Sequence, residues 1–304
     1  MIDVHVTDET SPLKAVILGI ADEMGGIPSL EEAYDPKSKM HIKAGSYPEE
    51  HAVSAEMEGF AEVLKKHGVE VYRPHILKDY NQVFSRDIGF VIDETFVRPR
   101  ILENREKEIQ GIDYILEKIP LKNQLEAPKG ARMEGGDIMP WDDHIFVGYS
   151  KQPDFDKYIV SRTNEAGLAF LADSFPSRTV KGFELKKSDD DPYLNALLLD
   201  CIFQPVCIDK AIIHKDGFKN REDYDFMVDY FGSANVFEID SQEMYSMFSN
   251  VFSISPEIVV SEKSFTRLNN QLRDWGFRVE EITYSETAKM EGLLRCSTLP
   301  LIRE

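Results

Sequence analysis

The chain has 304 residues, 42% of them hydrophobic, so it can bury a large core, and its length allows one large domain or two. No long Pro/Gly/Ser linker divides the sequence, and we expect one domain over residues 1–304. Asp and Glu number 54 against 35 Lys and Arg, which gives a net charge of −19 at pH 7. Such an acidic surface repels phosphate backbones and anionic lipids. We therefore expect no nucleic acid or membrane partner, whereas a small cation is compatible with it.

The ends and cysteines of the chain carry no targeting or disulfide signal. The first residues lack a basic stretch followed by an apolar run, and no apolar segment approaches the roughly 20 residues of a membrane helix. Cys201, Cys207 and Cys296 are too few for a disulfide framework and lack the spacing of a metal site. These features predict a cytoplasmic protein without metal or other cofactor, and they are compatible with a homo-oligomer.

A unit of one strand or a hairpin, an amphipathic helix and a further strand recurs five times. The expected helices cover residues 54–67, 104–118, 164–174, 220–231 and 264–275. The expected strands cover 15–19, 69–72, 88–92, 95–97, 137–139, 145–148, 179–185, 197–203, 210–214, 235–239, 251–253, 258–260 and 277–282. Five such units predict a closed α/β ring with pseudo-fivefold symmetry around a central channel, or else an open mixed sheet, which the same pattern permits.

The first helix illustrates the pattern. Met57, Phe60, Ala61 and Leu64 recur at the spacing that places side chains on one helical face. Gly68 follows and is expected to end the helix.

Four short motifs carry side chains that could react or bind a charged group. They are Phe84-Ser85-Arg86-Asp87, Glu134-Gly135-Gly136-Asp137, Leu198-Leu199-Asp200-Cys201 and Leu294-Arg295-Cys296-Ser297-Thr298. Taken singly, each has an ordinary structural explanation, such as a surface ion pair, a tight turn, a buried acid or a small core residue. Together they suit a guanidinium, a planar cation that carboxylates bind in pairs. Its central carbon is a poor electrophile, so attack needs a thiolate, which the bound cation can stabilise.

The order of these motifs resembles the guanidine-modifying, or pentein, superfamily of arginine deiminases, dimethylarginine hydrolases, agmatine deiminases and amidinotransferases. The resemblance covers essentially the whole chain and extends to Ser161-Arg162-Thr163-Asn164 and to Arg98-Pro99. It implies a five-bladed α/β propeller, which agrees with the five repeated units.

The resemblance also implies roles for particular residues. Cys296 is expected to be the nucleophile that forms a covalent thiouronium intermediate. Asp87 and Asp200 are expected to hold the guanidinium nitrogens. Glu134 is expected to accept a hydrogen bond from the substrate, beside the general acid/base.

Three further residues are candidates for binding the far end of the substrate. Asn81 stands six residues before Asp87, where arginine deiminases place an asparagine that touches the amino-acid end. Arg162 and Arg98 are candidates for a substrate carboxylate.

One position departs from the superfamily pattern. The catalytic histidine stands two residues before the aspartate that Asp200 matches, and here that residue is Leu198, which cannot transfer a proton. Strand alternation predicts that Leu198 and Asp200 share a face, so that Leu198 points into the site. The chain is then an altered form of an enzyme that normally has histidine there, a natural pseudoenzyme, or an enzyme in which His75, His144 or His214 substitutes.

The favoured hypothesis is a cysteine-dependent hydrolase of an arginine-like guanidine, because Glu134-Gly135-Gly136-Asp137 resembles the deiminases more than the transferases. The alternatives are an amidinotransferase, which passes the amidino group to an amine, and a silent guanidine-binding protein, which Leu198 favours. Arginine, its derivatives and agmatine are all compatible substrates. We expect one central cavity to be lined by Asp87, Glu134, Leu198, Asp200 and Cys296.

Overall fold

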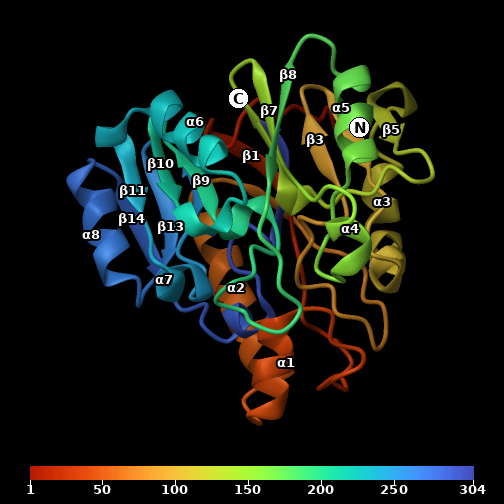
Figure 1. The fold of residues 1–304 in the computed structure, drawn as a ribbon. Helices are drawn as coiled ribbons and strands as arrows, with labels where there is room; N and C mark the ends of the chain where they lie inside the picture. The colour runs from red at the N-terminus through yellow and green to blue at the C-terminus, as the bar shows by residue number, and fades with distance from the viewer.

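The computed structural model describes residues 1–304, and its strands form five separate sheets of three strands each (Figure 1). The strands are β1 (Leu13–Leu18), β2 (Glu70–Tyr72), β3 (Phe90–Ile92), β4 (Thr95–Arg98), β5 (Gln124–Glu126), β6 (Ile138–Trp141), β7 (His144–Tyr149), β8 (Thr179–Glu184), β9 (Phe203–Val206), β10 (Lys210–Ile213), β11 (Val236–Glu238), β12 (Phe252–Ser255), β13 (Ile258–Glu262), β14 (Arg278–Ile282) and β15 (Thr298–Arg303). The sheets have the orders β15-β1-β2, β3-β4-β5, β6-β7-β8, β9-β10-β11 and β12-β13-β14.

All five sheets have the same pairing pattern. The middle strand is antiparallel to one neighbour and parallel to the other. A hairpin followed by a crossover to a parallel strand produces this pattern in four of them. The first sheet instead pairs the two ends of the chain, with Leu18 of β1 opposite Thr298 of β15. Five such sheets fit the five-unit arrangement and exclude the single open mixed sheet.

Eight α-helices connect or flank the strands. They are α1 (Pro36–Lys43), α2 (Glu50–Lys66), α3 (Asp113–Leu116), α4 (Asp154–Lys157), α5 (Glu165–Ser174), α6 (Arg221–Phe231), α7 (Ser241–Tyr245) and α8 (Thr266–Asp274). The four crossover helices α2, α5, α6 and α8 lie where the sequence predicts them, and α5, α6 and α8 lie toward the outside of the molecule (Figure 1).

The expected helix over 104–118 is wrong in type. Residues 103–112 form 3₁₀ turns, and only the short α3 follows them. In a 3₁₀ helix residues three apart eclipse each other, so Arg105 and Glu108 lie on one side of the turns and pair. This geometry lets both side chains reach the interior, where they are buried.

The apolar face of α2 packs into the largest hydrophobic core, as its spacing predicts. Met57, Phe60, Ala61 and Leu64 are each at most 1% exposed. The Phe60 ring meets those of Phe252 and Tyr284 edge to face, at centroid distances of 5.8 and 5.7 Å. Gly68, with φ of 78°, follows the C-terminus of α2 in the left-handed region that favours glycine.

The expected strand over 197–203 is also wrong. Residues 199–201 form a 3₁₀ turn, and β9 begins only at Phe203. The Leu199 N–H donates to Asp137 Oδ1 at 2.9 Å instead of to a neighbouring strand, so no ladder forms there. Strand alternation therefore does not determine where Leu198 and Asp200 point.

A shared feature of the motifs is their place in the sheets. In four of the sheets, a polar residue of a motif lies within four residues before the strand that is antiparallel to the middle strand. These residues are Asp87 before β3, Glu134 before β6, Asp200 before β9 and Cys296 before β15. The same position in each unit thus supplies the polar side chains, and the fold brings these positions together.

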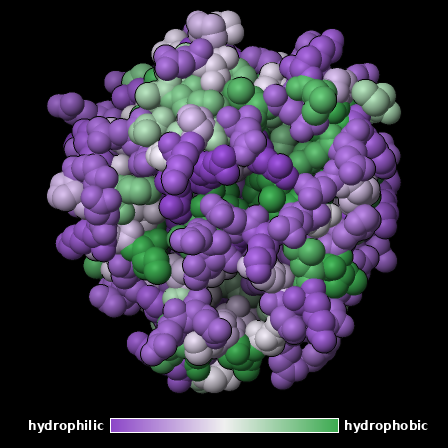
Figure 2. Space-filling view, turned by 90° about the vertical axis from the view of Figure 1, so that its right-hand side faces the viewer, coloured by the Kyte–Doolittle hydropathy of each residue, from purple (hydrophilic) through white to green (hydrophobic).

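The outer surface agrees with the charge of the chain. The face drawn in Figure 2 is mainly hydrophilic, with hydrophobic side chains in separate patches. None of the helices combines the length and the hydrophobicity that crossing a membrane requires.

Candidate active site

A cavity of about 330 Å³ opens among the turns that precede β3, β6, β9 and β15. Its wall includes six of the residues singled out in the sequence: Asn81, Asp87, Glu134, Arg162, Leu198 and Cys296. Asp200 is not part of the wall but lies directly behind the sulfur, with its Oδ2 3.4 Å from Cys296 Sγ. The structure therefore brings together all of the predicted site residues except Arg98.

Arg98 does not reach the cavity, which corrects its assignment to a substrate carboxylate. Its guanidinium pairs with Asp113 Oδ1 at 2.8 Å, and more than a third of each side chain is exposed. Arg98 ends β4, the middle strand of its sheet, whereas the polar groups of the cavity precede the first strands.

The Cys296 thiol is 2% exposed and has two polar neighbours. It donates to Asp200 Oδ2 at 3.4 Å, and the Asn250 amide donates to Sγ at 3.2 Å. Burial, followed by the charges of Asp200, Cys201 and Asp87, raises the pKa of this thiol well above its usual range. The raised pKa favours the neutral thiol, and a cation bound against the sulfur would favour the thiolate.

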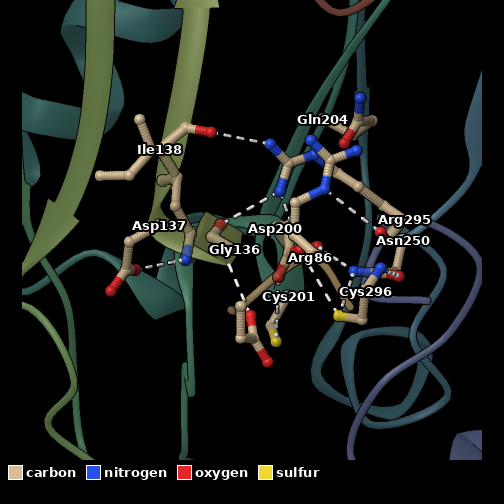
Figure 3. Close-up of polar contacts among 12 residues, drawn as sticks. Arg86, Gly136, Asp137, Ile138, Asp200, Cys201, Gln204, Asn250, Arg295 and Cys296 are labelled. Atoms are coloured by element: carbon tan, nitrogen blue, oxygen red, sulfur yellow. Dashed lines mark hydrogen bonds and ion pairs between the residues drawn. The ribbon is translucent and has the colours of Figure 1, made fainter. Parts of the chain in front are cut away.

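Arg295 connects Asp200 with two other parts of the chain (Figure 3). Its Nη1 lies 2.9 Å from Asp200 Oδ2, and its Nη2 lies 2.9 Å from Glu9 Oε1. The same guanidinium donates to the carbonyls of Gly136 and Ile138 at 3.2 and 2.9 Å. A fully buried guanidinium is tolerated only with such a set of acceptors, so Arg295 fixes the Asp200 carboxylate beside the sulfur.

Asp87 shares an arginine with Glu108. Arg105 Nη1 lies 2.7 Å from Asp87 Oδ2, and Arg105 makes two contacts of 2.8 Å with the Glu108 carboxylate. Burial and the nearby carboxylates of Glu134 and Asp200 outweigh Arg105 and raise the pKa of Asp87 to about 7. The other oxygen, Oδ1, accepts from the Gly136 N–H at 3.3 Å.

Glu134 is held by Arg162. The Arg162 Nη1 lies 3.2 Å from Glu134 Oε2, and the Leu102 N–H donates to Oε1 at 3.1 Å. Burial alone would raise the pKa of Glu134, but Arg162 and Arg105 outweigh it and hold the pKa below its usual range. Arg162 also donates to the Tyr34 carbonyl at 3.1 Å, while its Nε has no hydrogen-bond partner.

The charges around the cavity favour a cationic ligand. Within one buried cluster of the wall, the carboxylates of Asp87, Glu108 and Glu134 face only two arginines, Arg105 and Arg162, so this cluster has one carboxylate more than it has cations. Such an excess in a buried site is relieved by a bound proton or by a bound cation.

Asn81 and Leu198 complete the wall. The Asn81 side chain accepts from the Val83 N–H at 3.0 Å, and its amide nitrogen lies 3.6 Å from Met290 Sδ. A Cβ added to Gly136 would lie 2.5 Å from Leu198 Cδ1, 3.1 Å from Asp87 Oδ1 and 3.2 Å from Asp200 Oδ2. Leu198 therefore packs on bare backbone next to both carboxylates.

No histidine lines the cavity, which contradicts substitution by another histidine. The His75 ring stacks on Tyr114 at 4.1 Å. His144 contacts Asp143, and His214 Nδ1 contacts the Ile239 carbonyl at 2.8 Å.

Sequence reasoning missed Arg105, Glu108, Arg295 and Asn250. Arg295 is adjacent to Cys296 in the sequence, and this position could have identified it as a residue of the site. Arg105 and Glu108 stand in a segment that the sequence predicts to be an amphipathic helix, and its 3₁₀ geometry turns both side chains inward. No group of three or more His, Cys, Asp or Glu side chains is placed to hold a metal ion.

Comparison with known proteins agrees with this geometry. Residues 35–303 match the sequence profile of a family described as "N,N dimethylarginine dimethylhydrolase, eukaryotic". The uncharacterized protein YkgA of Bacillus subtilis (strain 168) is 27% identical over 245 residues, which are 80% of this chain and 77% of YkgA.

Two further proteins extend the likeness. An arginine deiminase of Listeria monocytogenes serotype 4b is 25% identical over 263 residues, which cover 74% of this chain but only 62% of the deiminase. The structure of SxtG, an amidinotransferase of Microseira wollei in the saxitoxin biosynthetic pathway, superposes with a TM-score of 0.77 at 18% identity. That superposition covers 99% of this chain and 98% of SxtG and shows a shared α/β fold. With 269 of its residues matching the profile, the chain belongs to the N,N-dimethylarginine dimethylhydrolase family, within the pentein superfamily of guanidine-modifying enzymes.

Proposed function

We propose that the chain is a cysteine-dependent hydrolase of the guanidino group of an arginine-like substrate, and that Leu198 impairs its turnover. One observation carries this proposal. The Cys296 sulfur lies 3.4 Å from the Asp200 carboxylate, at a cavity whose wall also contains Asp87 and Glu134. A thiol among carboxylates is a poor nucleophile alone, and it becomes an effective one when a planar cation enters beside it.

Substrate binding follows from the charges. The guanidinium would place its nitrogens against Asp87 and Asp200, and its positive charge would compensate the carboxylate that is in excess of the arginines. The other end of the substrate would reach Asn81 and Arg162. The unpartnered Nε–H of Arg162 supports a ligand that carries an acceptor, such as a carboxylate.

The reaction would proceed in two stages. The bound cation favours loss of the thiol proton to solvent, and the sulfur attacks the guanidinium carbon to give a tetrahedral adduct. The departing amine takes up a proton from solvent as its C–N bond breaks, which leaves a covalent thiouronium on Cys296. Water then adds to the same carbon and gives up a proton to solvent, the C–S bond breaks to restore the thiolate, and the product leaves with the urea-type oxygen.

Leu198 bears on both proton transfers. A histidine at this position would protonate the amine and later deprotonate the water, but leucine does neither. The cavity wall offers carboxyl groups and no imidazole. Attack by the sulfur is therefore expected to be faster than departure of the amine and addition of water, so that a covalent adduct on Cys296 accumulates.

Two alternatives rest on particular observations. The likeness in fold to SxtG favours an amidinotransferase, in which an amine instead of water takes the amidino group. Leu198 favours a protein that binds guanidines and does not turn them over.

We further infer that the five sheets close into a five-bladed α/β propeller with pseudo-fivefold symmetry. The identical pairing pattern of the sheets supports this, and so does the sheet in which β15 joins β1. A central cavity formed by equivalent turns is what such a ring would produce.

The test is mass spectrometry of the intact protein after incubation with arginine, N-methylated arginines or agmatine. A mass increase that maps to Cys296, and that is absent from C296S, would support the proposal. Release of citrulline or ammonia would identify a hydrolase, and release of ornithine in the presence of an acceptor amine would identify a transferase. Binding without any adduct or product would favour the silent protein, and no binding at all would refute the proposal.

A further inference from the structure

Four of the five sheets supply the motifs discussed above, and the fifth supplies Asn250. Asn250 stands two residues before β12, just as Cys296 stands two residues before β15. Both strands are antiparallel to the middle strand of their sheets. Equivalent positions in the five units thus converge on one place, and Asn250, which is 0% exposed, belongs to this set.

The Asn250 side chain binds Cys296 at two points (Figure 3). Its Oδ1 accepts from the Cys296 N–H at 3.1 Å, and its Nδ2 donates to Cys296 Sγ at 3.2 Å. Nδ2 also donates to the backbone carbonyl of Asp200 at 3.3 Å. One amide therefore bridges the backbone and the sulfur of the same residue and fixes the direction of the thiol.

The orientation of this amide follows from its partners. A backbone N–H can only donate, so the amide oxygen must face the Cys296 N–H. A carbonyl oxygen can only accept, so the amide nitrogen must face Asp200 O and, with it, the sulfur. In a flipped amide, Oδ1 would face the Asp200 carbonyl oxygen and Nδ2 would face the Cys296 N–H, so neither hydrogen bond could form. The sulfur therefore receives a hydrogen bond from Asn250.

No cationic side chain makes a polar contact with the sulfur. The titratable groups that face it are Asp200 and Cys201 from the turn before β9, Asp87 from the turn before β3, and the buried Tyr284. Arg295 and Arg105 are directed at carboxylates. Asn250 is thus the side chain that donates to the sulfur before a substrate arrives, and the backbone of Leu293 is the other group that lowers the pKa of the thiol.

We propose that Asn250 is a catalytic residue whose amide N–H stabilises the Cys296 thiolate. A donor binds an anionic sulfur more strongly than a neutral thiol, so the contact strengthens when the proton leaves. It would act twice in a catalytic cycle, as the sulfur attacks and as the sulfur is expelled from the thiouronium. This role in turnover rests on the proposed function, whereas the effect on the thiol does not. Asn250 neither accepts nor donates a proton outright, so it does not replace the missing histidine.

Two substitutions of Asn250 and one control isolate the contact. N250D keeps the shape and the acceptor for the Cys296 N–H but replaces the donor by a carboxylate oxygen. N250A removes both groups. S249A is the matched control, because Ser249 Oγ donates to the same Asp200 carbonyl at 2.9 Å and does not contact the sulfur.

The readout is the rate at which iodoacetamide alkylates Cys296, followed by peptide mass over a series of pH values. The half-buried Cys207 serves as an internal standard for the reagent. Because the thiol is mostly protonated at these pH values, its rate at a fixed pH is proportional to its acidity constant. This measurement requires no guanidine substrate, so it can fail or succeed independently of the proposed function.

We expect N250A to slow alkylation of Cys296 about tenfold at a fixed pH, which corresponds to about one pKa unit, and N250D to slow it further. S249A should stay close to the parent protein. Unchanged rates in N250A would overturn the inference, and so would an equal slowing in S249A, since the effect would then act through Asp200. If thermal unfolding shows that N250D does not fold, N250A and S249A decide the question alone.

Discussion

Leu198 sits where a proton-transfer group would meet both carboxylates of the site. Its Cδ1, Asp87 Oδ1 and Asp200 Oδ2 all surround the space above Gly136. An imidazole has a volume similar to that of a leucine side chain, so the cavity can accept it without moving the backbone. The carboxylates would then hold the ring and favour its charged form.

We therefore expect Leu198→His to raise the turnover of a guanidine by about 10²–10⁴-fold, because a placed acid/base contributes that much. The measurement is steady-state release of the ureido or ornithine product. Leu198→Gln is the control, since it is polar but transfers no proton near neutral pH. An unchanged rate on every guanidine would indicate a pseudoenzyme, and full activity of the parent chain would show that another group carries the proton.

A second prediction at this scale concerns pH. The pKa of Asp87 is raised to about 7, and a guanidinium binds the ionised carboxylate. Below this pH binding must displace a proton, so the affinity should fall by up to tenfold for each unit of pH. Above it the affinity should be constant. Calorimetric titration with arginine across this range would show it.

Asp87→Asn is the matched variant for this titration. It has no carboxylate to titrate and should bind weakly, without a change near pH 7. The neighbouring groups Arg105, Glu134 and Asp200 remain in place in this variant. An unchanged pH profile in Asp87→Asn would assign the titration to one of the other carboxyl groups.

At the residue scale, the sequence predicted the motifs of the site but not the side chains that pair with them. Asp87, Glu134 and Cys296 stand in recognisable order, and the structure brings them to one cavity. Arg98 was wrongly assigned to a substrate carboxylate, because the Arg98-Pro99 pair does not reveal from the sequence where the arginine side chain points. Arg105 enters the site from a segment with no motif at all.

At the scale of elements, most hairpin strands and four of the five crossover helices were predictable from the sequence, whereas the 3₁₀ turns over 103–112 and 199–201 were not. Periods of two and 3.6 residues identify a strand and a helix from local sequence alone. The mainly apolar run from Leu197 to Phe203 predicts one strand, yet residues 199–201 form a 3₁₀ turn. The reason is that the Leu199 N–H donates a hydrogen bond to Asp137, which belongs to another unit. Such a contact depends on tertiary structure, and no local pattern contains it.

The N-terminus of α5 provides a test of local stabilisation near the site. Asn164 caps this helix by accepting from the Gly167 N–H at 3.0 Å, and it also accepts from the Arg132 N–H at 3.2 Å. Asn164→Ala should lower the free energy of unfolding by about 1–2 kcal/mol. Urea unfolding measures this, with the exposed Glu165→Ala expected within about 0.5 kcal/mol of the parent chain. Equal stabilities of the two variants would contradict the capping role.

For the whole molecule, Arg295 is the side chain that ties distant segments together. It joins Glu9, Asp200 and the carbonyls of Gly136 and Ile138, which belong to three different parts of the chain. Lysine cannot reach all these acceptors. We expect Arg295→Lys to cost about 3–5 kcal/mol, because buried carboxylates lose their partner.

Denaturant unfolding would check the Arg295→Lys prediction. The control is Arg100→Lys, whose pair with Glu126 is about half exposed and should contribute less than about 1 kcal/mol. A loss below about 1 kcal/mol for Arg295→Lys would show that water or a relaxed backbone replaces its contacts.

The pairing of β1 with β15 has a consequence for how the protein is made. Asp87, Glu134 and Asp200 leave the ribosome well before Cys296, and β1 finds its antiparallel partner only when residues 298–303 are synthesised. Until then β1 has an open edge, which is prone to pair with other chains. A translation product that stops before residue 296 would lose the nucleophile and the closing strand in one event, and we expect it to aggregate or be degraded instead of persisting as a guanidine-binding competitor.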